Sequence, residues 1–199
     1  MGDGKVSRFS MLEFALITGI RCAGEEEARA RIIPNKRLLD LYFGGKGLVT
    51  PPQLEDAFRR YDHLLDKLKL GLVYILESIL RCRHHRTSID LFSLDVVDYI
   101  VALNSFSWGR RCYTDILYVF RRVHTMSKSE RGKHKYDVYG FCMALQLWAY
   151  EAILALGSKW TIRRETSCPR IFHWRAHEKP SAKDLTAILD DPQECHPVE

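Results

Sequence analysis

Residues 50–80 decide the fold, and they read TPPQLEDAFRRYDHLLDKLKLGLVYILESIL. Thr50 and Gln53 have the spacing of a capping box, and the prolines that directly follow Thr50 suit the first positions of a helix. From this start apolar residues recur at helical spacing, at Leu54, Phe58, Tyr61, Leu65 and Leu68. The apolar run 70–80 carries the pattern past Gly71 into a second helix, which we expect to form the centre of the core.

Other segments on both sides of this stretch also have helical patterns. Ser10 and Glu13 have capping-box spacing at the start of a short helix, 11–18, which we expect to be buried and to end at Gly19. Residues 93–104 and 111–123 form two more helices, and Asp98 faces away from the apolar stripe of the first. Residues 136–157 predict a central helix that stops at Gly157.

The C-terminal region predicts smaller elements. Residues 170–174 alternate like a short strand, and Ser181 with Asp184 caps a last helix that ends near Leu189. There is no internal repeat, heptad series or low-complexity tract. The predicted fold class is mainly α, a single-domain helical bundle over 1–189 with at most a small strand pair near 170–175, followed by an acidic linker or tail, 190–199.

Length and composition favour one sizeable core, since the chain has 199 residues of which 46% are hydrophobic. No apolar run resembles a signal peptide or reaches the roughly 18 residues of a membrane helix. We therefore expect a soluble protein that is not exported, cut from a longer chain. Six cysteines without a secretory signal favour reduced thiols.

The positive charge is concentrated within the chain. The formal net charge is +5, but the last ten residues hold four acids and no Lys or Arg, so 1–189 carries 30 basic against 21 acidic side chains, a net +9. Residues 81–164 carry 14 basic against 7 acidic side chains, a net +7. Such a concentration steers a protein towards polyanions.

Several islands of sequence resemble a plant domain of unknown function that occurs in transposon-encoded proteins, often upstream of a ubiquitin-like-protein protease domain. They are Phe9 to Cys22 (FSMLEFALITGIRC), the run 70–80, Ser105 to Arg110 (SFSWGR), Gly140 to Ile153 (GFCMALQLWAYEAI) and Pro169 to Trp174 (PRIFHW). A functional parallel within that family is the VANC group, the anti-silencing proteins of VANDAL Mutator-like elements. The resemblance implies recognition of short DNA motifs in the protein's own element and relief of DNA methylation there.

Three basic clusters are the candidate DNA contacts, because Lys and Arg neutralise phosphates and Arg also binds guanine edges. The first comprises Arg81, Arg83, His84, His85 and Arg86, with Thr87 and Ser88 as hydroxyl donors to phosphate. The second is Arg110 with Arg111. The third is Arg121, Arg122, Lys128, Arg131, Lys133 and Lys135, mostly in a loop over 124–135. We expect all three on loops that border apolar helices.

Each cluster also has a simpler explanation. A charged loop is often only solvated surface, basic residues after a helix complement its dipole, and Trp108 with Gly109 is typical of a packed turn. Cys168, His173 and His177, with Cys82, His84 and His85, are weak candidates for zinc because no C-x-x-C pair exists. We therefore predict no metal and no cofactor.

No catalytic motif is present. Gly44 to Gly47 lacks the form of a phosphate loop, and Glu151 in an apolar helix is more simply a partner of another helix or an arginine. We therefore expect a nuclear protein that is not an enzyme, that binds double-stranded DNA, and that has no membrane association. Chromatin factors or a second copy of the chain are further possible partners. The alternative is a protein-interaction module that tethers a protease or a chromatin factor.

Overall fold

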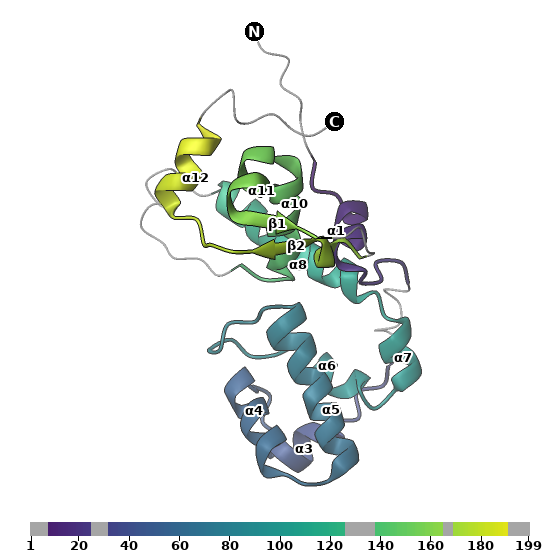
Figure 1. Cartoon of the computed structure of the whole chain (residues 1–199). Coiled ribbons are helices and arrows are strands. Elements are labelled where there is room, and N and C mark those ends of the chain that lie inside the picture. Colours follow the sequence, from purple (N-terminus) through teal and green to yellow (C-terminus); the bar gives the residue numbers. More distant parts are fainter. Residues whose placement is uncertain (1–7, 25–31, 126–137, 165–168, 191–199) are drawn as a thin grey trace. The chain divides into compact units, whose positions relative to one another are not determined.

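The computed structural model describes residues 8–24, 32–125, 138–164 and 169–190 (Figure 1). The described residues hold ten α-helices and one two-stranded antiparallel sheet, and 63% of them are helical, so the predicted mainly α fold class with one small strand pair is confirmed. The chain forms two compact units, which we call unit 1 (Met1–Ile20 with Cys142–Glu199) and unit 2 (Arg21–Phe141). Two compact units can still fold as one domain. The single domain over 1–189 therefore stays a prediction.

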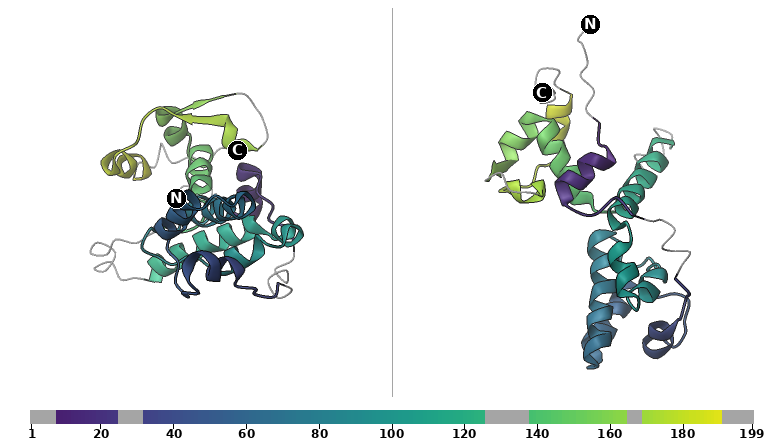
Figure 2. Two further views of the ribbon diagram at one scale, coloured as in Figure 1. Left: turned by 90° about the horizontal axis from the view of Figure 1, so that it is seen from below. Right: turned by 90° about the vertical axis from the view of Figure 1, so that its right-hand side faces the viewer.

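The described residues of unit 2 form seven helical elements that follow one another in sequence. They are α3 (Arg37–Phe43), α4 (Pro51–Arg60), α5 (Leu64–Tyr74), the π-helix η1 (Ile75–Leu80), α6 (Phe92–Val96), α7 (Ile100–Ser105) and α8 (Trp108–Thr125). Helix α5 continues into η1, and the two form the long rod of this unit in Figure 2. Leu70, Val73 and Leu76 on this rod are buried, which confirms that the run 70–80 supplies the centre of the core.

The predicted start of α4 is confirmed, but the helix is shorter than its apolar spacing indicates. Thr50 and Gln53 form the capping box, and the Thr50 backbone N–H donates to Gln53 Oε1 at 2.8 Å. The helix ends at Arg60, and α5 begins at Leu64, where His63 Nδ1 accepts from the backbone N–H of Asp66. The helix is therefore interrupted between Arg60 and Leu64, and Leu65 and Leu68 of the apolar pattern belong to α5.

The expected helix over 93–104 is two helices, α6 and α7, and the prediction that Asp98 faces away is wrong. The Asp98 carboxylate accepts hydrogen bonds from the Arg37 guanidinium at 2.7 and 3.2 Å and from Lys69 Nζ at 2.6 Å. Arg37 also forms a bidentate pair with Asp66, at 2.7 and 3.0 Å, and the Tyr42 hydroxyl donates to Asp66 at 2.8 Å. This cluster ties α3 and α5 to the segment between α6 and α7.

The cluster lowers the pKa of both carboxyl groups. Hydrogen bonds from Arg37 hold the pKa of Asp66 at about 2, with Tyr42 contributing and burial opposing. Burial on its own would raise the pKa of Asp98, but hydrogen bonds from Arg37 and Lys69 outweigh that effect and lower it. Both charged carboxylates are therefore stabilised by folding.

We predict that Asp66 makes the fold acid-sensitive. Its folded pKa of about 2 lies below the unfolded value of roughly 3.9, so its contribution is fully present above about pH 4 and is lost as the pH falls towards 2. Urea unfolding at pH 7, 4, 3 and 2 measures the free energy of unfolding at each pH. Asp66→Asn should lower this free energy at pH 7, and the free energy of the variant should change less than that of the wild type between pH 4 and pH 2. Asp62→Asn, whose side chain is 96% exposed, should keep the wild-type profile. Equal profiles for the two variants would contradict the assignment.

Unit 1 combines an N-terminal helix with the C-terminal part of the chain. Its elements are α1 (Met11–Thr18), α10 (Cys142–Ala152), α11 (Leu154–Trp160), β1 (Thr161–Arg163), the 3-10 helix η2 (Arg170–His173), β2 (Trp174–Ala176) and α12 (Ala182–Leu189). Helix α1 packs against α10 and η2, while α11 contacts β1 and α12. Strands β1 and β2 are antiparallel with Ile162 opposite Arg175.

The bounds of α1 and the capping box at Ser181 and Asp184 are confirmed, whereas four details differ. Ser10 accepts from the Glu13 backbone N–H, but the Glu13 carboxylate pairs with Arg170, and Leu12 is 67% exposed, so α1 is buried on one face only. The predicted central helix divides at Ile153, and Gly157 lies buried inside α11. The strand begins only at Trp174, because the preceding residues form η2.

Candidate nucleic-acid interface

Helix α8 is an 18-residue amphipathic helix, about 27 Å long at 1.5 Å per residue. Cys112, Ile116 and Val119 are buried on its apolar face. Burial raises the pKa of the Cys112 thiol to about 12, so this cysteine stays protonated and acts as a packing residue. The apolar face fixes which side of the helix meets solvent.

The opposite face of α8 is polar and rich in arginine. Its members recur at helical spacing and fall within about a third of the helix circumference: Arg110, Arg111, Thr114, Tyr118, Arg121, Arg122 and Thr125. All are exposed except Arg110 and Arg111, which are half-buried, and Tyr118 is 62% exposed. Asp115 is the only acidic residue of α8 itself, and it lies at the edge of this face. We call these seven residues the α8 polar face.

The expectation that Arg110 and Arg111 lie on a loop is wrong, because both belong to the first turn of α8. Arg110 Nε donates to the Cys22 carbonyl at 3.3 Å, and the Arg111 guanidinium lies 3.4 Å from Asp90. Trp108 donates its indole N–H to the Leu103 carbonyl at 2.9 Å, as in a packed turn. The first turn of α8 therefore serves partly to anchor the helix.

The first basic cluster follows η1 directly, and its first member is inside the protein. Arg81 is 1% exposed, with Nη1 donating to Glu77 at 3.0 Å and Nε donating to Asp115 of α8 at 2.9 Å. A guanidinium in this position cannot reach a phosphate, so its prediction as a DNA contact is corrected. Arg81 is instead the link between η1 and α8.

Glu77, which is fully buried, is the acceptor at the centre of this link. Besides Arg81 it accepts from the Ser93 hydroxyl at 2.6 Å and from the Asp90 backbone N–H at 3.1 Å. A buried carboxylate with this many donors is well satisfied. The π-helical geometry of η1 contributes here, because the Arg81 backbone N–H donates five residues back, to the Leu76 carbonyl at 3.0 Å.

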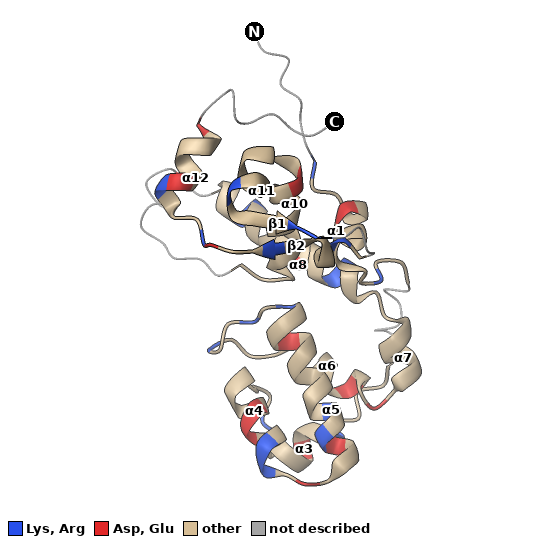
Figure 3. Ribbon diagram, viewed as in Figure 1, with Lys and Arg blue, Asp and Glu red and all other residues tan. Residues whose placement is uncertain are grey.

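The rest of the cluster forms the tip of a loop between Arg81 and Ile89. Ile89 is buried and its N–H donates to the Val49 carbonyl at 2.8 Å, so the loop is anchored at both ends. The Arg86 N–H donates to His84 Nδ1 at 3.2 Å, and the His84 and His85 rings lie 4.0 Å apart. His85 and Arg86 are exposed, and Thr87 and Ser88 are half-buried. Figure 3 shows the arginines of this loop in blue.

Most other basic groups near this loop are paired with acids. Arg83 is half-buried, with its guanidinium 5.3 Å from the centre of the Tyr139 ring and 3.8 Å from Glu77. In the described part of the chain no carboxylate forms an ion pair with Arg86, Arg121 or Arg122. Lys128, Arg131, Lys133 and Lys135 lie outside the described residues. Among the described predicted contacts, the uncompensated positive charge therefore lies at the loop tip, at Arg110 in the first turn of α8, and at Arg121 and Arg122 near its C-terminal end.

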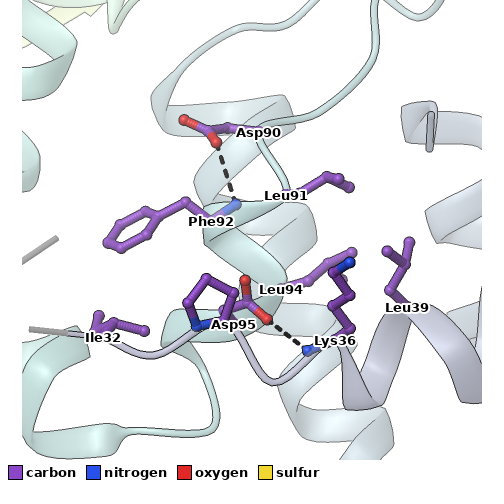
Figure 4. Close-up of a pocket in the computed structure, with 9 residues that line it drawn as sticks. Ile32, Lys36, Leu39, Asp90, Leu91, Phe92, Leu94 and Asp95 are labelled. Carbon is purple, nitrogen blue, oxygen red and sulfur yellow. Dashed lines mark hydrogen bonds between the residues drawn. The ribbon is translucent and has the colours of Figure 1, made fainter. Parts of the chain in front are cut away.

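A pocket of about 310 Å³ lies between the segment before α3 and helix α6 (Figure 4). Its two carboxylates already accept hydrogen bonds from backbone groups, Asp90 from the Phe92 N–H and Asp95 from the Lys36 N–H, each at 3.1 Å. Leu39, Leu91 and Leu94 supply apolar walls. The pocket is thus a junction where α3 and α6 are held together, and Lys36 is the one basic residue among the described residues that line it.

The structure thus defines a mainly helical chain with an arginine-rich amphipathic helix. The family described as Domain of unknown function (DUF1985) matches residues 2–119, more than half of the chain, and the chain belongs to that family. No curated protein and no solved structure matches it. The match runs from α1 into α8 and stops before the last turn of that helix. The resemblance to a domain of unknown function is therefore confirmed as DUF1985, and the VANC link stays a prediction.

Two further properties concern only the described residues. None of their helices is long and apolar enough to cross a membrane. They also contain no group of three His, Cys, Asp or Glu side chains placed to hold a metal ion. Cys168, one of the weak zinc candidates, lies outside them.

We predict that Arg81 is a stability residue. Arg81→Met leaves the buried Glu77 without its cation and should lower the free energy of unfolding by about 3–5 kcal/mol. Arg86→Ala, at the exposed tip of the same loop, should change it by less than about 0.5 kcal/mol. Urea unfolding followed by circular dichroism measures both values. Combining Arg81→Met with Glu77→Gln should recover part of the loss, and similar small losses for both arginine variants would show that the ion pair does not anchor the loop.

Proposed function

We propose that this chain is a double-stranded DNA-binding domain, with the α8 polar face as its main contact surface. The observation that carries the proposal is the combination of exposed Arg121, Arg122 and Tyr118 on one face of a long, firmly packed helix. The major groove admits an α-helix, arginine binds phosphates and guanine edges, and tyrosine and threonine donate hydrogen bonds. The exposed loop tip at His85 and Arg86 adds a second phosphate contact from the same unit.

The anchoring of α8 supports this assignment. A helix that reads a groove must be held rigidly, and α8 is fixed by its buried apolar residues and by the ion pair between Asp115 and Arg81. The exposed Arg121 and Arg122 lie near its C-terminal end, beyond these anchors. Arginines near a helix C-terminus also complement the helix dipole, which stabilises the end of α8 that carries them.

The resemblance to VANC proteins adds a cellular role to the proposal. By that parallel the domain recognises short motifs in the transposon that encodes it, acts in the nucleus and counteracts DNA methylation there. Sequence preference requires base contacts in addition to phosphate contacts. Thr114 and Tyr118, at the centre of the α8 polar face, are the side chains we assign to base contacts.

We predict that Arg121→Ala/Arg122→Ala weakens DNA binding and lowers its salt dependence. Each lost phosphate contact lowers the magnitude of the slope of log affinity against log salt by about 0.9, so the double substitution should lower it by about 1.8. Fluorescence anisotropy with labelled element-derived duplexes between 50 and 200 mM salt measures the slope. Lys179→Ala/Lys183→Ala removes two exposed charges from unit 1 and should leave the slope unchanged.

The same titrations test sequence preference. Tyr118→Ala should reduce the ratio of affinities for element-derived and random duplexes and leave the salt slope near the wild-type value. Wild-type protein that binds both duplexes equally and weakly at physiological salt would refute sequence-specific recognition. An unchanged slope in the double arginine variant would refute the role of α8.

A further inference from the structure

The rod formed by α5 and η1 exposes an apolar stripe that no described element covers. Its members follow at intervals of four, three, four and four residues, at Leu64, Leu68, Gly71, Ile75 and Ile79. Leu64 is 78% exposed and Leu68 is 61% exposed, and Ile75 and Ile79 are about half exposed at 46% and 49%. Leu65 borders the stripe on α5, as does Phe58 from α4. We call these seven residues the α5 seam.

The seam contains a groove of about 360 Å³ where α4 lies beside α5. Gly71 lines it and lets α4 approach closely, because a Cβ at this position would lie 3.0 Å from the Phe58 ring. The ring therefore lies close against the α5 backbone, with Leu68 and Ile75 on either side of it. The walls are apolar, so the groove suits the aliphatic side chains of a facing helix.

The charges at the rim of the groove are already paired. Arg59 binds Glu55 at 2.6 Å, and Lys67 lies 3.6 Å from Asp62 and 5.8 Å from the centre of the Phe58 ring. The rim therefore presents no net charge to a partner. The rim therefore has no electrostatic attraction for a polyanion, and it does not repel a second neutral, apolar surface.

The size of the seam fits a dimer. Its exposed side chains offer on the order of 600 Å² of apolar surface, at the upper end of the largest patch on a typical monomer, about 300–600 Å². A standard interface buries about 800 Å² on each partner. A stripe at helical spacing is also self-complementary, because the leucines of one copy can occupy the groove of the other around a two-fold axis.

We propose that two copies of this chain associate through the α5 seam into a two-fold symmetric dimer. Each copy contributes protruding Leu64 and Leu68 side chains and receives those of its partner in the groove beside Gly71. The inference does not rest on DNA binding, since none of the seam residues belongs to the α8 polar face or to the loop tip.

Sedimentation velocity of the whole chain, freed of nucleic acid with nuclease, tests the proposal between 1 and 100 μM. The expected species has twice the 23.2 kDa mass of one chain. It should persist in 0.5 M NaCl because apolar contacts are not screened by salt. Leu68→Glu should raise the dimer dissociation constant at least 100-fold, because dimerisation would bury an unpaired carboxylate.

Two further variants keep the test decisive. Leu64→Glu changes the most exposed seam residue and should also give monomers with an unchanged circular dichroism spectrum. Val101→Glu changes an equally exposed apolar residue, 78% exposed on α7, and should leave the dimer intact. A wild-type chain that stays monomeric at every concentration would overturn the proposal. A dimer that survives both seam substitutions would overturn it as well.

Discussion

The buried ion pair between Arg81 and Glu77 is the constraint on which unit 2 depends. Both side chains are essentially inaccessible to water, and a charge there is tolerable only because each one has several partners. Glu77 collects donors from the segment before α6 and from α6 itself, while Arg81 reaches Asp115 on α8. One pair of charges thereby sets the positions of the rod, the basic loop and α8. Replacing it by apolar residues could preserve stability, but it would remove the directional contacts that fix these three elements relative to one another.

Because of these ion pairs, the net charge of the sequence overstates the positive charge that is free at the surface. The sequence counts Arg81, Arg83 and Arg111 towards the basic excess, yet the structure sets them beside Glu77, Asp90 and Asp115, an equal number of acids. The three arginines link η1 and the basic loop to α8. The exposed positive charge comes from other arginines, such as Arg86 and Arg121. A linear charge count cannot separate these roles, because the acid that neutralises an arginine often lies on another helix. Asp115 is 34 residues from Arg81.

Local signals in the sequence predicted the local structure well. The caps at Thr50 and Ser181, the bounds of α1 and the burial of the run 70–80 follow from hydrogen bonds and periodicity within a few residues. Predictions failed where a distant partner decides the outcome. Glu13 binds Arg170 instead of closing its own cap, Asp98 is drawn to Arg37, and Gly157 packs inside a helix because a Cβ there would lie 2.5 Å from the Tyr150 carbonyl. The α8 polar face was visible in the sequence only as two separate pairs of arginines.

The α5 seam and the α8 polar face lie in the same unit, and this links the two proposals physically. A two-fold dimer through the seam would present α8 twice with a fixed separation, and dimeric DNA-binding proteins use such pairs to read two half-sites. The second α8 would then bind at a high effective concentration, which raises affinity without any new contact. A monomer reading the same few bases has to draw its specificity from one helix alone. If both proposals hold, the preferred DNA sites should therefore be paired motifs with constant spacing, and a monomeric seam variant should keep its phosphate contacts while losing most of its discrimination between paired and single motifs.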